Sequence, residues 1–526
     1  MATPLPEYSN FAEDVIDRLA REDASGLALL WLDASGAREQ RFGFADLARE
    51  SRAVAAGLQR LGLRPGERVM LVVGREPAWW ICSVALIRAG LVALPGTTLL
   101  TPKDFAARIE SAGVAGVIAD AANAEKLDAI RAQHPGLRVH VVCGGERAGW
   151  TPLAELASGR GDFERVRTRS VDPCLIYFTS GTTGPPKRVV HTHASYPLAH
   201  ARTGDWWLGV GRGDLHWNLS DTGWAKAAYS SLFGPWSQGA GVFAQAAAGR
   251  FDPAATLETL RRFPISSFCA PPTAFRQLIA LPELATTPLP ALRRVQAAGE
   301  PLNPEVWHAF RAATGIEIRE GYGQTESTIL VCNHESFPVR PGSMGRAAPG
   351  FEVAVLGDDL APAAAGAEGE IAVRVAPERP LGLFAGYEGN PEENAAKFRG
   401  DWYLTGDRGT RDADGYFWFI GRSDDVILSA GYRIGPFEVE SALVEHPAVL
   451  EAAVVGKADP ERYQIVKAFV SLRPGHAPSP ALARALQEHV KRVTAPYKYP
   501  REIEFTQELP KTVSGKIRRV ELRARS

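Results

Sequence analysis

The sequence predicts an α/β protein with a large N-terminal domain and a small C-terminal domain, and three observations support this. The chain has 526 residues, and at roughly 150 residues per domain this length favours two or more domains. From residue 69, short apolar runs alternate with helical patterns, as they do in buried parallel strands joined by helices. Near residue 422, a charged, turn-rich stretch precedes a C-terminal part with strands and a helix of its own. We therefore expect domains at 1–422 and 423–526.

The elements of the N-terminal domain can be placed in order along the chain. The first helix should begin after Asn10, a suitable N-cap with Glu13 three residues later, because Phe11, Val15 and Leu19 then recur every four residues. The alternation that follows predicts, in order, strand 69–73, helix 78–89, strand 92–94, helix 104–112, strand 117–119, helix 123–132 and strand 139–142. The helix near residue 80 is apolar for only about ten residues, half of what a membrane span needs, so we expect it to be buried.

The C-terminal elements start from an aromatic strand at 416–420. The charged turn Gly421-Arg-Ser-Asp-Asp425 follows it and predicts a short hinge. Beyond the hinge, apolar runs predict strands at 452–455 and 468–472, and a helical pattern covers 481–493. The second domain should therefore be small and of mixed α and β structure.

Composition and charge exclude several classes of protein. With 59 Lys and Arg against 60 Asp and Glu, the net charge is −1, which gives no overall field to attract nucleic acid or an anionic membrane. The five cysteines have neither zinc-finger nor redox-pair spacing, and their odd number gives no closed disulfide framework. The N-terminus lacks a basic region followed by an apolar core, and its acidic residues disfavour a transit peptide. We therefore expect a cytoplasmic protein without a membrane span.

A loop rich in glycine and hydroxyl groups follows the apolar strand 174–178. It reads Tyr177-Phe-Thr-Ser-Gly-Thr-Thr-Gly-Pro-Pro-Lys187. Glycines allow consecutive backbone N–H groups to turn toward one anion, the hydroxyls add donors, and Lys187 adds a fixed charge. The phosphate loop of kinases and GTPases requires Gly-Lys-Ser/Thr, whereas Pro185 follows Gly184 here. The sequence therefore predicts a phosphate-binding loop of a different family.

This loop resembles the signature of the AMP-forming adenylating superfamily, which includes acyl-CoA synthetases, luciferases and peptide-synthetase adenylation domains. Further motifs of that superfamily follow in order, namely Gly321-Tyr-Gly-Gln-Thr-Glu326, Tyr403-Leu-Thr-Gly-Asp407, Gly421-Arg-Ser-Asp-Asp425, Gly431-Tyr-Arg-Ile-Gly435 and Pro510-Lys-Thr-Val-Ser-Gly-Lys516. Six ordered motifs are very improbable by chance. The segments Trp217-Asn-Leu-Ser-Asp-Thr-Gly-Trp224, Gly234-Pro-Trp236 and Thr494-Ala-Pro-Tyr-Lys-Tyr-Pro-Arg501 are similar to the medium-chain acyl-CoA synthetases.

The resemblance implies an ATP-dependent carboxylic acid–CoA ligase. Such an enzyme first forms acyl-AMP and pyrophosphate, and the thiol of CoA then displaces AMP. The first step brings two anions together, so the site has to supply cations and oriented N–H dipoles. By resemblance, the catalytic residues are Lys516, which contacts the α-phosphate and the acid, Thr325, which donates to the α-phosphate, and Glu326, whose hard oxygen ligand suits Mg²⁺.

The same resemblance assigns the nucleotide contacts. Tyr322 should pack on adenine opposite the turn Ala298-Gly-Glu-Pro301, and Asp407 and Arg422 should bind the ribose, since one carboxylate accepts from two hydroxyls. The expected ATP-binding residues are Thr179, Ser180, Gly181, Thr182, Thr183, Gly184, Lys187, Gly299, Glu300, Pro301, Glu320, Gly321, Tyr322, Gly323, Gln324, Thr325, Asp407, Arg422 and Lys516.

The small domain is expected to be mobile. Asp424 resembles the hinge about which this domain rotates, so that Lys516 enters for adenylation and withdraws for thioester formation. Gly431 should lie beside the pantetheine of CoA, where a side chain would intrude. The expected CoA contacts are Ser429, Ala430, Gly431, Tyr432, Arg433, Arg462, Lys491, Tyr499 and Arg501. Lys516 is also a candidate target of a lysine acetyltransferase and a deacetylase, because acetylation removes its charge.

The identity of the acid stays open. Trp224 and Gly323 are expected at the acyl pocket, and Gly323 occupies the position of a tryptophan that closes the pocket in acetate-restricted relatives. Acids of about C4–C10 should therefore fit, each buried methylene improving binding. Benzoate, other aromatic acids and branched acids are alternatives, as are an adenylation enzyme that loads a carrier protein and a non-catalytic ATP sensor. The oligomeric state is open as well.

Overall fold

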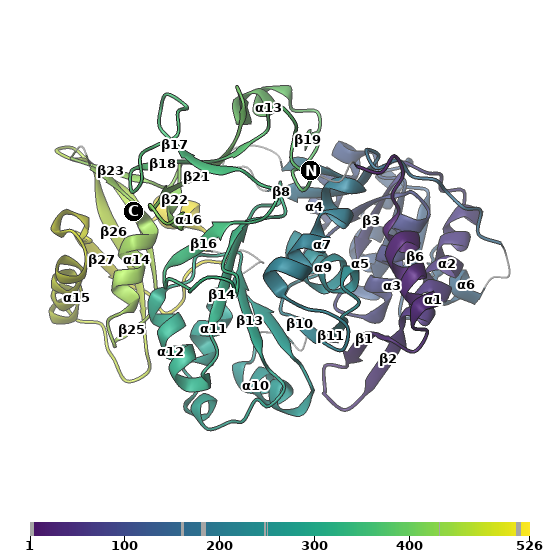
Figure 1. Ribbon diagram of the computed structural model, residues 1–526, viewed down its shortest axis with the longest axis horizontal. Helices are drawn as coiled ribbons and strands as arrows, with labels where there is room; N and C mark the ends of the chain where they lie inside the picture. The colour runs from purple at the N-terminus through teal and green to yellow at the C-terminus, as the bar shows by residue number, and fades with distance from the viewer. Residues whose placement is uncertain are drawn as a thin grey trace.

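The computed structural model describes residues 5–158, 162–179, 186–246, 249, 251–430, 432–511 and 517–526. The strands within these residues form three sheets. In Figure 1 the N-terminal elements lie at the right in purple and blue, and the C-terminal elements lie at the left in yellow-green. The predicted fold class, with a large part of mixed sheets and helices and a smaller C-terminal part, is confirmed.

The eight-stranded sheet contains the parallel α/β unit that the sequence predicts. Its strands, in spatial order, are β19 (Gly386–Tyr387), β9 (Lys187–Thr192), β8 (Pro173–Thr179), β4 (Val92–Pro95), β3 (Arg68–Val72), β5 (Gly116–Asp120), β6 (Val139–Cys143) and β7 (Thr151–Pro152). Helices of this region are α2 (Phe44–Arg60), α3 (Pro77–Arg88), α4 (Pro102–Ala112), α5 (Ala121–Asp128) and α6 (Leu153–Ser158). Every element predicted between residues 69 and 142 is present, with its ends displaced by a few residues.

Helix α3 is the buried helix that the apolar run predicts. All its residues from Trp79 to Arg88 are buried. Arg88 brings a charge into this interior, and its two terminal nitrogens lie 2.8 and 2.7 Å from the carboxylate oxygens of Asp17. A buried charge is tolerated only when it is paired in this way. Among the described residues, no helix combines the length and apolarity that a bilayer crossing requires.

The first helix begins where it was predicted but is capped by a different acid. The side chain of Asn10 accepts a hydrogen bond from the backbone N–H of Ala12 at 3.2 Å. The carboxylate that accepts from the N–H of Asn10 belongs to Asp14, at 2.7 Å, and not to the predicted Glu13. The first turns, Ala12–Asp17, are wound as a π-helix before α1 (Arg18–Glu22). This wider winding moves the reciprocal contact one residue along the chain, and Glu13 pairs with Arg165 instead.

The second sheet is the largest and forms the centre of the molecule (Figure 1). Its strands, in spatial order, are β17 (Val353–Leu356), β18 (Glu368–Arg374), β21 (Trp402–Arg411), β22 (Phe417–Arg422), β16 (Ser343–Ala347), β15 (Ile329–Cys332), β14 (Ile318–Gly323), β13 (Arg294–Ala298), β12 (Ser267–Ala270), β10 (Leu215–Asn218), β11 (Gly241–Gln245), β1 (Leu27–Leu32) and β2 (Glu39–Gly43), with β20 (Phe398–Arg399) beside β21. Helices α10 (Pro253–Arg262), α11 (Pro272–Leu278) and α12 (Pro304–Thr314) connect its parallel strands. Strands β12, β13 and β14 are parallel, so their carboxyl ends meet at one edge.

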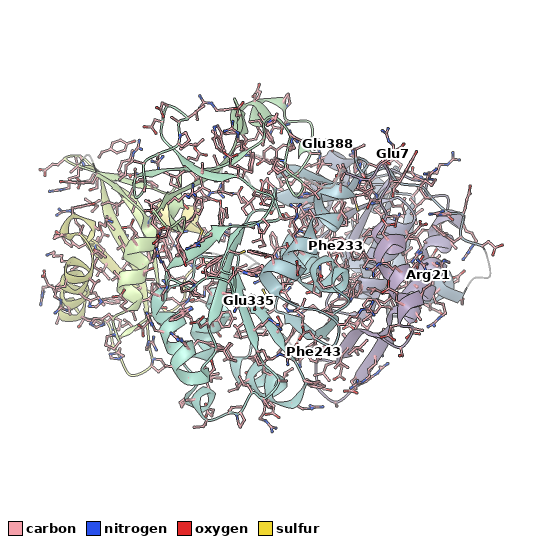
Figure 2. The ribbon with its side chains drawn as sticks, in the orientation of Figure 1. Glu7, Arg21, Phe233, Phe243, Glu335 and Glu388 are labelled. Carbon is pink, nitrogen blue, oxygen red and sulfur yellow. The ribbon has the colours of Figure 1, made fainter. Side chains whose placement is uncertain are left out.

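Three large hydrophobic clusters of the described residues fill the interior around these two sheets, and two of them support the region of the site. Phe233 belongs to one and Phe243 to the other, each only 1% exposed, and both side chains are labelled in Figure 2. The two tryptophans that flank the predicted acyl region, Trp217 and Trp236, are buried in different clusters. They therefore support the fold around the site from within the core.

The third sheet consists of C-terminal residues only. Its strands are β24 (Tyr432–Ile434), β23 (Ile427–Ser429), β26 (Tyr463–Leu472) and β25 (Val449–Asp459), with β27 (Glu502–Phe505) beside β26. Helices α14 (Pro436–Val444), α15 (Pro480–Val493) and α16 (Arg519–Ala524) complete this part. Its hydrophobic cluster is built from residues 427–505 alone. The predicted strands at 452–455 and 468–472 and the helix at 481–493 are all present, whereas the domain boundary at 422 remains a prediction.

Candidate active site

The predicted phosphate loop lies between two paired strands. Thr179 ends β8 and Lys187 begins β9, and the two residues face each other in the antiparallel register. Five of the predicted phosphate contacts, Ser180, Gly181, Thr182, Thr183 and Gly184, lie outside the described residues. The ammonium of Lys187 forms an ion pair with Glu393 and lies 5.4 Å from the centre of the Tyr387 ring. The pairing of β8 with β9 therefore fixes both ends of the loop.

The turn that follows β14 carries Thr325 and Glu326 and is held by several contacts. The carbonyl of Thr325 accepts a hydrogen bond from Nε2 of His191 at 2.7 Å. The carbonyl of Glu326 accepts from the N–H of Phe384 at 2.8 Å, and its Oε1 accepts from the hydroxyl of Tyr387 at 2.7 Å. Both predicted catalytic side chains are half-buried. The turn is therefore anchored by β9 and by the segment around β19.

Glu326 fits the role of a single Mg²⁺ ligand. In the described part of the chain, only Oε1 of its two carboxylate oxygens accepts a hydrogen bond. The described residues contain no group of three or more His, Cys, Asp or Glu side chains that could hold a metal ion by themselves. Magnesium usually keeps several waters and binds one or two carboxylates together with substrate phosphates. The single carboxylate of Glu326, with one oxygen held by Tyr387, fits a site of this kind.

A second polar cluster surrounds Asp407 in β21. Its Oδ2 accepts from the hydroxyl of Tyr322 and from Nε2 of Gln324, both at 2.6 Å. Its Oδ1 lies 3.3 Å from Nε of Arg422, which faces it in the β21–β22 register. The amide of Gln324 also donates to the carbonyl of Thr405 and accepts from Tyr403. Three of the predicted ATP-binding residues therefore meet around the buried carboxylate of a fourth, Asp407.

The predicted adenine wall follows β13 at the same sheet edge. Gly299 has a φ of +101°, and a side chain there would meet no atom within 4 Å, so the glycine serves the backbone conformation of the turn. Glu300 accepts from the hydroxyl of Thr273 at 2.8 Å, and its Oε2 lies 3.5 Å from Arg276. Pro301 completes the turn before the buried Leu302. This wall is therefore braced by helix α11.

Two further predicted ATP contacts, Glu320 and Gly321, are buried in β14. The side chain of Glu320 is 5% exposed and accepts a hydrogen bond from the N–H of Leu302 at 3.3 Å. Burial raises the pKa of this carboxyl well above its usual range. A Cβ atom at Gly321 would lie 2.5 Å from the ring of Trp207, so this glycine lets the indole pack against the strand. The protein interior therefore sets the position of the Glu320 side chain and leaves no room for a side chain at residue 321.

The predicted acyl-pocket residues have different surroundings. Trp224 is half-buried, and its indole N–H is buried without a hydrogen-bond partner in the described structure. Gly323 is exposed at the end of β14, where the pairing with β15 shifts register. A Cβ atom there would lie 2.6 Å from the carbonyl oxygen of Thr328. The absence of a side chain at this position therefore has a local backbone reason in addition to the predicted pocket.

The predicted CoA residues are spread over the C-terminal part. The ammonium of Lys491 lies 4.2 Å from the ring centre of Tyr499, and Arg501 donates to the Tyr499 hydroxyl at 2.9 Å. Tyr432 is 51% exposed and stacks on Tyr497, with ring centres 4.1 Å apart. The structure therefore joins Lys491, Tyr499 and Arg501 into one cationic, aromatic cluster.

The remaining CoA and hinge predictions concern the segment around β23. Ser429 is buried, Ala430 has a positive φ of +49°, and the N–H of Ala430 donates to the carbonyl of Arg462 at 3.0 Å. A guanidinium nitrogen of Arg433 lies 4.0 Å from a carboxylate oxygen of the exposed Asp358. Asp424 lies in the turn after β22, with Oδ1 3.9 Å from Arg422. Two predictions, Gly431 and Lys516, lie outside the described residues.

Sequence reasoning missed two residues that contact the Thr325–Glu326 turn, His191 and Tyr387. His191 is the fifth residue of the strand that begins at Lys187, so the strand pattern places it four residues from the phosphate loop. Tyr387 follows the turn by about 60 residues and carries no local signal. Its neighbour Glu388, labelled in Figure 2, pairs with Arg68 and Arg188 and ties this segment to the eight-stranded sheet.

Comparison with family models and with curated proteins identifies relatives over nearly the whole chain. The model described as AMP-binding enzyme matches residues 17–387, and the model described as AMP-binding enzyme C-terminal domain matches residues 438–516. The acyl-coenzyme A synthetase ACSM3, mitochondrial, of Mus musculus is 46% identical over 529 residues, covering 99% of this chain and 91% of that protein. The acyl-coenzyme A synthetase ACSM5, mitochondrial, of Homo sapiens is 46% identical over 531 residues with the same coverage.

Solved structures show the same fold. The anthranilate CoA ligase AuaEII, solved in complex with anthranoyl-AMP, has a TM-score of 0.91 and 32% identity, covering 99% of this chain and 98% of that chain. A benzoate CoA ligase from Burkholderia xenovorans has a TM-score of 0.85 and 30% identity, covering 98% of this chain and 99% of that chain.

The relatives also correct one prediction. The cytoplasmic location expected from the N-terminal residues is contradicted, because the acyl-coenzyme A synthetases from mouse and human are mitochondrial by name. The lack of an evident targeting pattern in the first residues carries no information about location. The resemblance drawn from the six motifs, in contrast, is confirmed. The chain belongs to the AMP-binding, adenylate-forming enzyme family, in which its relatives are acyl-coenzyme A synthetases.

Proposed function

We propose that the chain is an ATP-dependent carboxylic acid–CoA ligase that acts on medium-chain fatty acids. A carboxylate oxygen of the acid attacks the α-phosphorus of ATP, and the bond from that phosphorus to the bridging oxygen breaks, which releases pyrophosphate. The sulfur of CoA then attacks the acyl carbon, the thiol proton is lost, and AMP leaves with the carbon–oxygen bond electrons. The observation that carries the proposal is the arrangement of the Thr325–Glu326 turn and the Asp407 cluster at the end of one strand, β14.

The polar groups of this site suit the two anions that must meet there. Lys187 begins β9 beside the phosphate loop, and Thr325 and Glu326 occupy the turn after β14. When bound, Mg²⁺ would neutralise phosphate charge, and Glu326 is the residue proposed to hold it. Asp407 and Arg422 would bind the ribose, and Tyr322 would lie beside adenine. Preorganised donors and charges of this kind are usually the largest contribution to such catalysis.

The proposed acid is medium-chain, of about C4–C10, because each additional buried methylene should improve binding by about 0.8 kcal/mol until the pocket is full. Gly323 is exposed and places no side chain beside the turn, and the half-buried Trp224 offers an apolar wall. Aromatic acids are the second candidate class, because the anthranilate and benzoate CoA ligases are similar to this chain over almost its entire length.

The direct test is AMP release by the purified enzyme with ATP, Mg²⁺, CoA and a series of acids. We expect weak activity with acetate that rises through butyrate to hexanoate and octanoate. Benzoate and anthranilate are assayed in parallel to test the aromatic class of acids. Replacing CoA by a pantetheinylated carrier protein tests the carrier-loading alternative, and acid-dependent pyrophosphate exchange excludes a non-catalytic ATP sensor. A higher kcat/KM for acetate than for hexanoate would contradict the proposed chain length.

Lys516→Ala tests the proposed division of labour between the half-reactions. We expect pyrophosphate exchange to fall by about 10²–10³-fold, because one preorganised charge is lost, while supplied acyl-AMP is still converted to acyl-CoA. Arg518→Ala is the matched control, since it removes an exposed cation from the same tail. An equal loss in both half-reactions would make Lys516 a structural residue. Acetylation of Lys516 by a lysine acetyltransferase should have the same effect as the alanine variant.

A further inference from the structure

His191 connects the strand after the phosphate loop to the turn that carries Thr325 and Glu326. Its side chain is fully buried, and Nε2 lies 2.7 Å from the carbonyl oxygen of Thr325, 134 residues further along the chain. His191 belongs to β9, which begins at Lys187. The same strand pairs with β19, where Val189 faces Tyr387, whose hydroxyl donates to Glu326.

The hydrogen-bond partners of the imidazole determine which nitrogen carries the proton. Burial lowers the pKa of His191 to about 4, so the ring is neutral near pH 7 and has a single N–H. The carbonyl of Thr325 can only accept, which assigns that N–H to Nε2. Nδ1 then accepts from the hydroxyl of Ser195 at 3.2 Å, and Ser195 in turn accepts from the N–H of Thr192 at 2.8 Å. With this tautomer, every hydrogen bond in the chain from Thr192 to Thr325 has one donor and one acceptor.

The ring is also held by packing. The centre of the Tyr196 ring lies 4.4 Å from that of His191, and the ring of Tyr177 lies 6.5 Å away. The Tyr196 hydroxyl donates to the carbonyl of Ala225 at 3.0 Å, next to Trp224 in the proposed acyl region. The imidazole therefore has little freedom to rotate away from Thr325.

The carbonyl of Thr325 and the N–H of Glu326 lie in one planar peptide group. Fixing the direction of that carbonyl, together with the hydrogen bond from Phe384 to the next carbonyl, restricts the plane and so the positions from which the two side chains leave the backbone. We propose that His191 is a positioning residue for adenylation, holding the Thr325–Glu326 peptide so that the Thr325 hydroxyl and the Glu326 carboxylate point at the α-phosphate and its Mg²⁺. This inference rests on the proposed function for the roles of Thr325 and Glu326.

Two substitutions at this position separate the hydrogen bond from the bulk of the ring. His191→Phe keeps an aromatic ring but has no donor for the Thr325 carbonyl, whereas His191→Gln keeps an N–H near the position of Nε2. We expect His191→Phe to lower kcat for acid-dependent pyrophosphate exchange by about 10²-fold, the scale of a misplaced catalytic group. The Mg²⁺ concentration for half-maximal exchange should rise, KM for the acid should stay within about twofold, and His191→Gln should recover at least about tenfold of the loss.

The matched control is His216→Phe. His216 is equally buried and hydrogen-bonded through both nitrogens, to Ser267 and Ser230, neither of which belongs to the Thr325–Glu326 turn. Both phenylalanine variants should lower the thermal midpoint, but only His191→Phe should separate the half-reactions, slowing exchange while supplied acyl-AMP still reacts with CoA. The pH profile of His191→Gln should keep the shape of the wild-type profile, because a neutral donor does not titrate between pH 6 and 9.

Three results would overturn the inference. His191→Phe could behave like His216→Phe, with both half-reactions reduced in step with stability, in which case the residue is structural. Exchange by His191→Phe could equal that of the wild type. The profile of His191→Gln could lose an ionisation seen in the wild type, which would make His191 an acid or base. Failure of the proposed function is distinct, because the wild-type enzyme would then show no exchange with any acid.

Discussion

The buried carboxyl of Glu320, one of the predicted ATP contacts, makes the stability of the fold depend on pH. Its pKa is raised by burial, so the folded protein favours the protonated form and the unfolded chain the ionised one. The contribution of Glu320 to stability is therefore fully present below the pKa of the unfolded chain, about 4.5. It is lost as the pH rises toward the pKa of the folded protein. Glu320→Gln removes this penalty, because the amide is neutral at every pH. The thermal midpoint of the variant, relative to the wild type, should rise between pH 5 and pH 8.

Glu335→Gln is the control for this measurement, because that side chain is exposed. A midpoint difference for Glu320→Gln that is the same at both pH values would show that the carboxyl is ionised in the folded protein. The KM for ATP should change by less than about threefold, since the side chain faces the interior; a larger rise would assign it a direct contact with nucleotide.

Gly323 has two possible roles that can be separated by comparing two substitutions. Gly323→Ala introduces only the Cβ that would lie 2.6 Å from the Thr328 carbonyl, so it tests the backbone role and should lower kcat/KM for all acids by a similar factor. Gly323→Trp introduces the same Cβ contact and, in addition, an indole ring. Relative to the alanine variant, we expect it to lower kcat/KM for hexanoate by at least about tenfold more than for acetate, as a closed pocket would. If the ratio of kcat/KM for hexanoate to kcat/KM for acetate is the same in both variants, Gly323 has only the backbone role.

At the scale of elements, a charge network connects the proposed adenine wall to the C-terminal sheet. Arg276 in α11 lies 3.5 Å from Glu300 and 3.7 Å from Glu451 in β25. Glu451 accepts two hydrogen bonds from Lys511, at 2.7 and 2.9 Å, five residues before the proposed catalytic Lys516. The side chains of Arg276, Glu300 and Glu451 are each at most 16% exposed, so solvent screens these charges less than it would at the surface.

This network should favour the orientation in which the tail lies near the adenine wall. Glu451→Gln weakens its attraction to both cations, so we expect pyrophosphate exchange to fall by about fivefold to tenfold while conversion of supplied acyl-AMP is unchanged or faster. Glu502→Gln is the control, because it weakens ion pairs with Lys457 and Lys467 inside the C-terminal sheet. Parallel losses in the two half-reactions would show that the network serves the folding of the small domain.

The elements that sequence patterns could predict are those with local causes. Buried parallel strands give continuous apolar runs, and helices between them give a different period, so the order from β3 to β6 was predictable. The predicted capping acid of the first helix was wrong by one residue, because hydrophobic spacing does not reveal a π-helical turn. The motifs located Tyr322, Gln324, Asp407 and Arg422, and the fold brings them together. The hydrogen bond from His191 to Thr325 was not predictable, because it joins a strand of the eight-stranded sheet to the turn between β14 and β15 of the largest sheet.

At the scale of the whole molecule, buried histidines make stability depend on pH. Burial lowers the pKa of His191 and of His193 to about 4 and that of His216 to about 3. In the unfolded chain, histidine titrates at about 6.5. Between pH 6.5 and about 4, the unfolded chain therefore binds more protons than the folded one. The stability that these residues contribute is present above pH 6.5 and is lost as pH falls.

His216→Gln should remove one of these contributions at a residue that is not among the proposed site residues. The variant loses hydrogen bonds and so starts from a lower thermal midpoint at pH 7, but its further loss on acidification to pH 5 should be smaller than that of the wild type, by up to about 2 kcal/mol of unfolding free energy. Glu320 acts in the opposite direction above pH 4.5 in both proteins, so its effect cancels in the comparison. His476→Gln, at an exposed position, should follow the wild type. The thermal midpoint of His216→Gln could instead fall with pH in parallel with those of the wild type and of His476→Gln. Protonation of His216 would then not accompany unfolding, and the acid sensitivity would have to come from the other buried histidines.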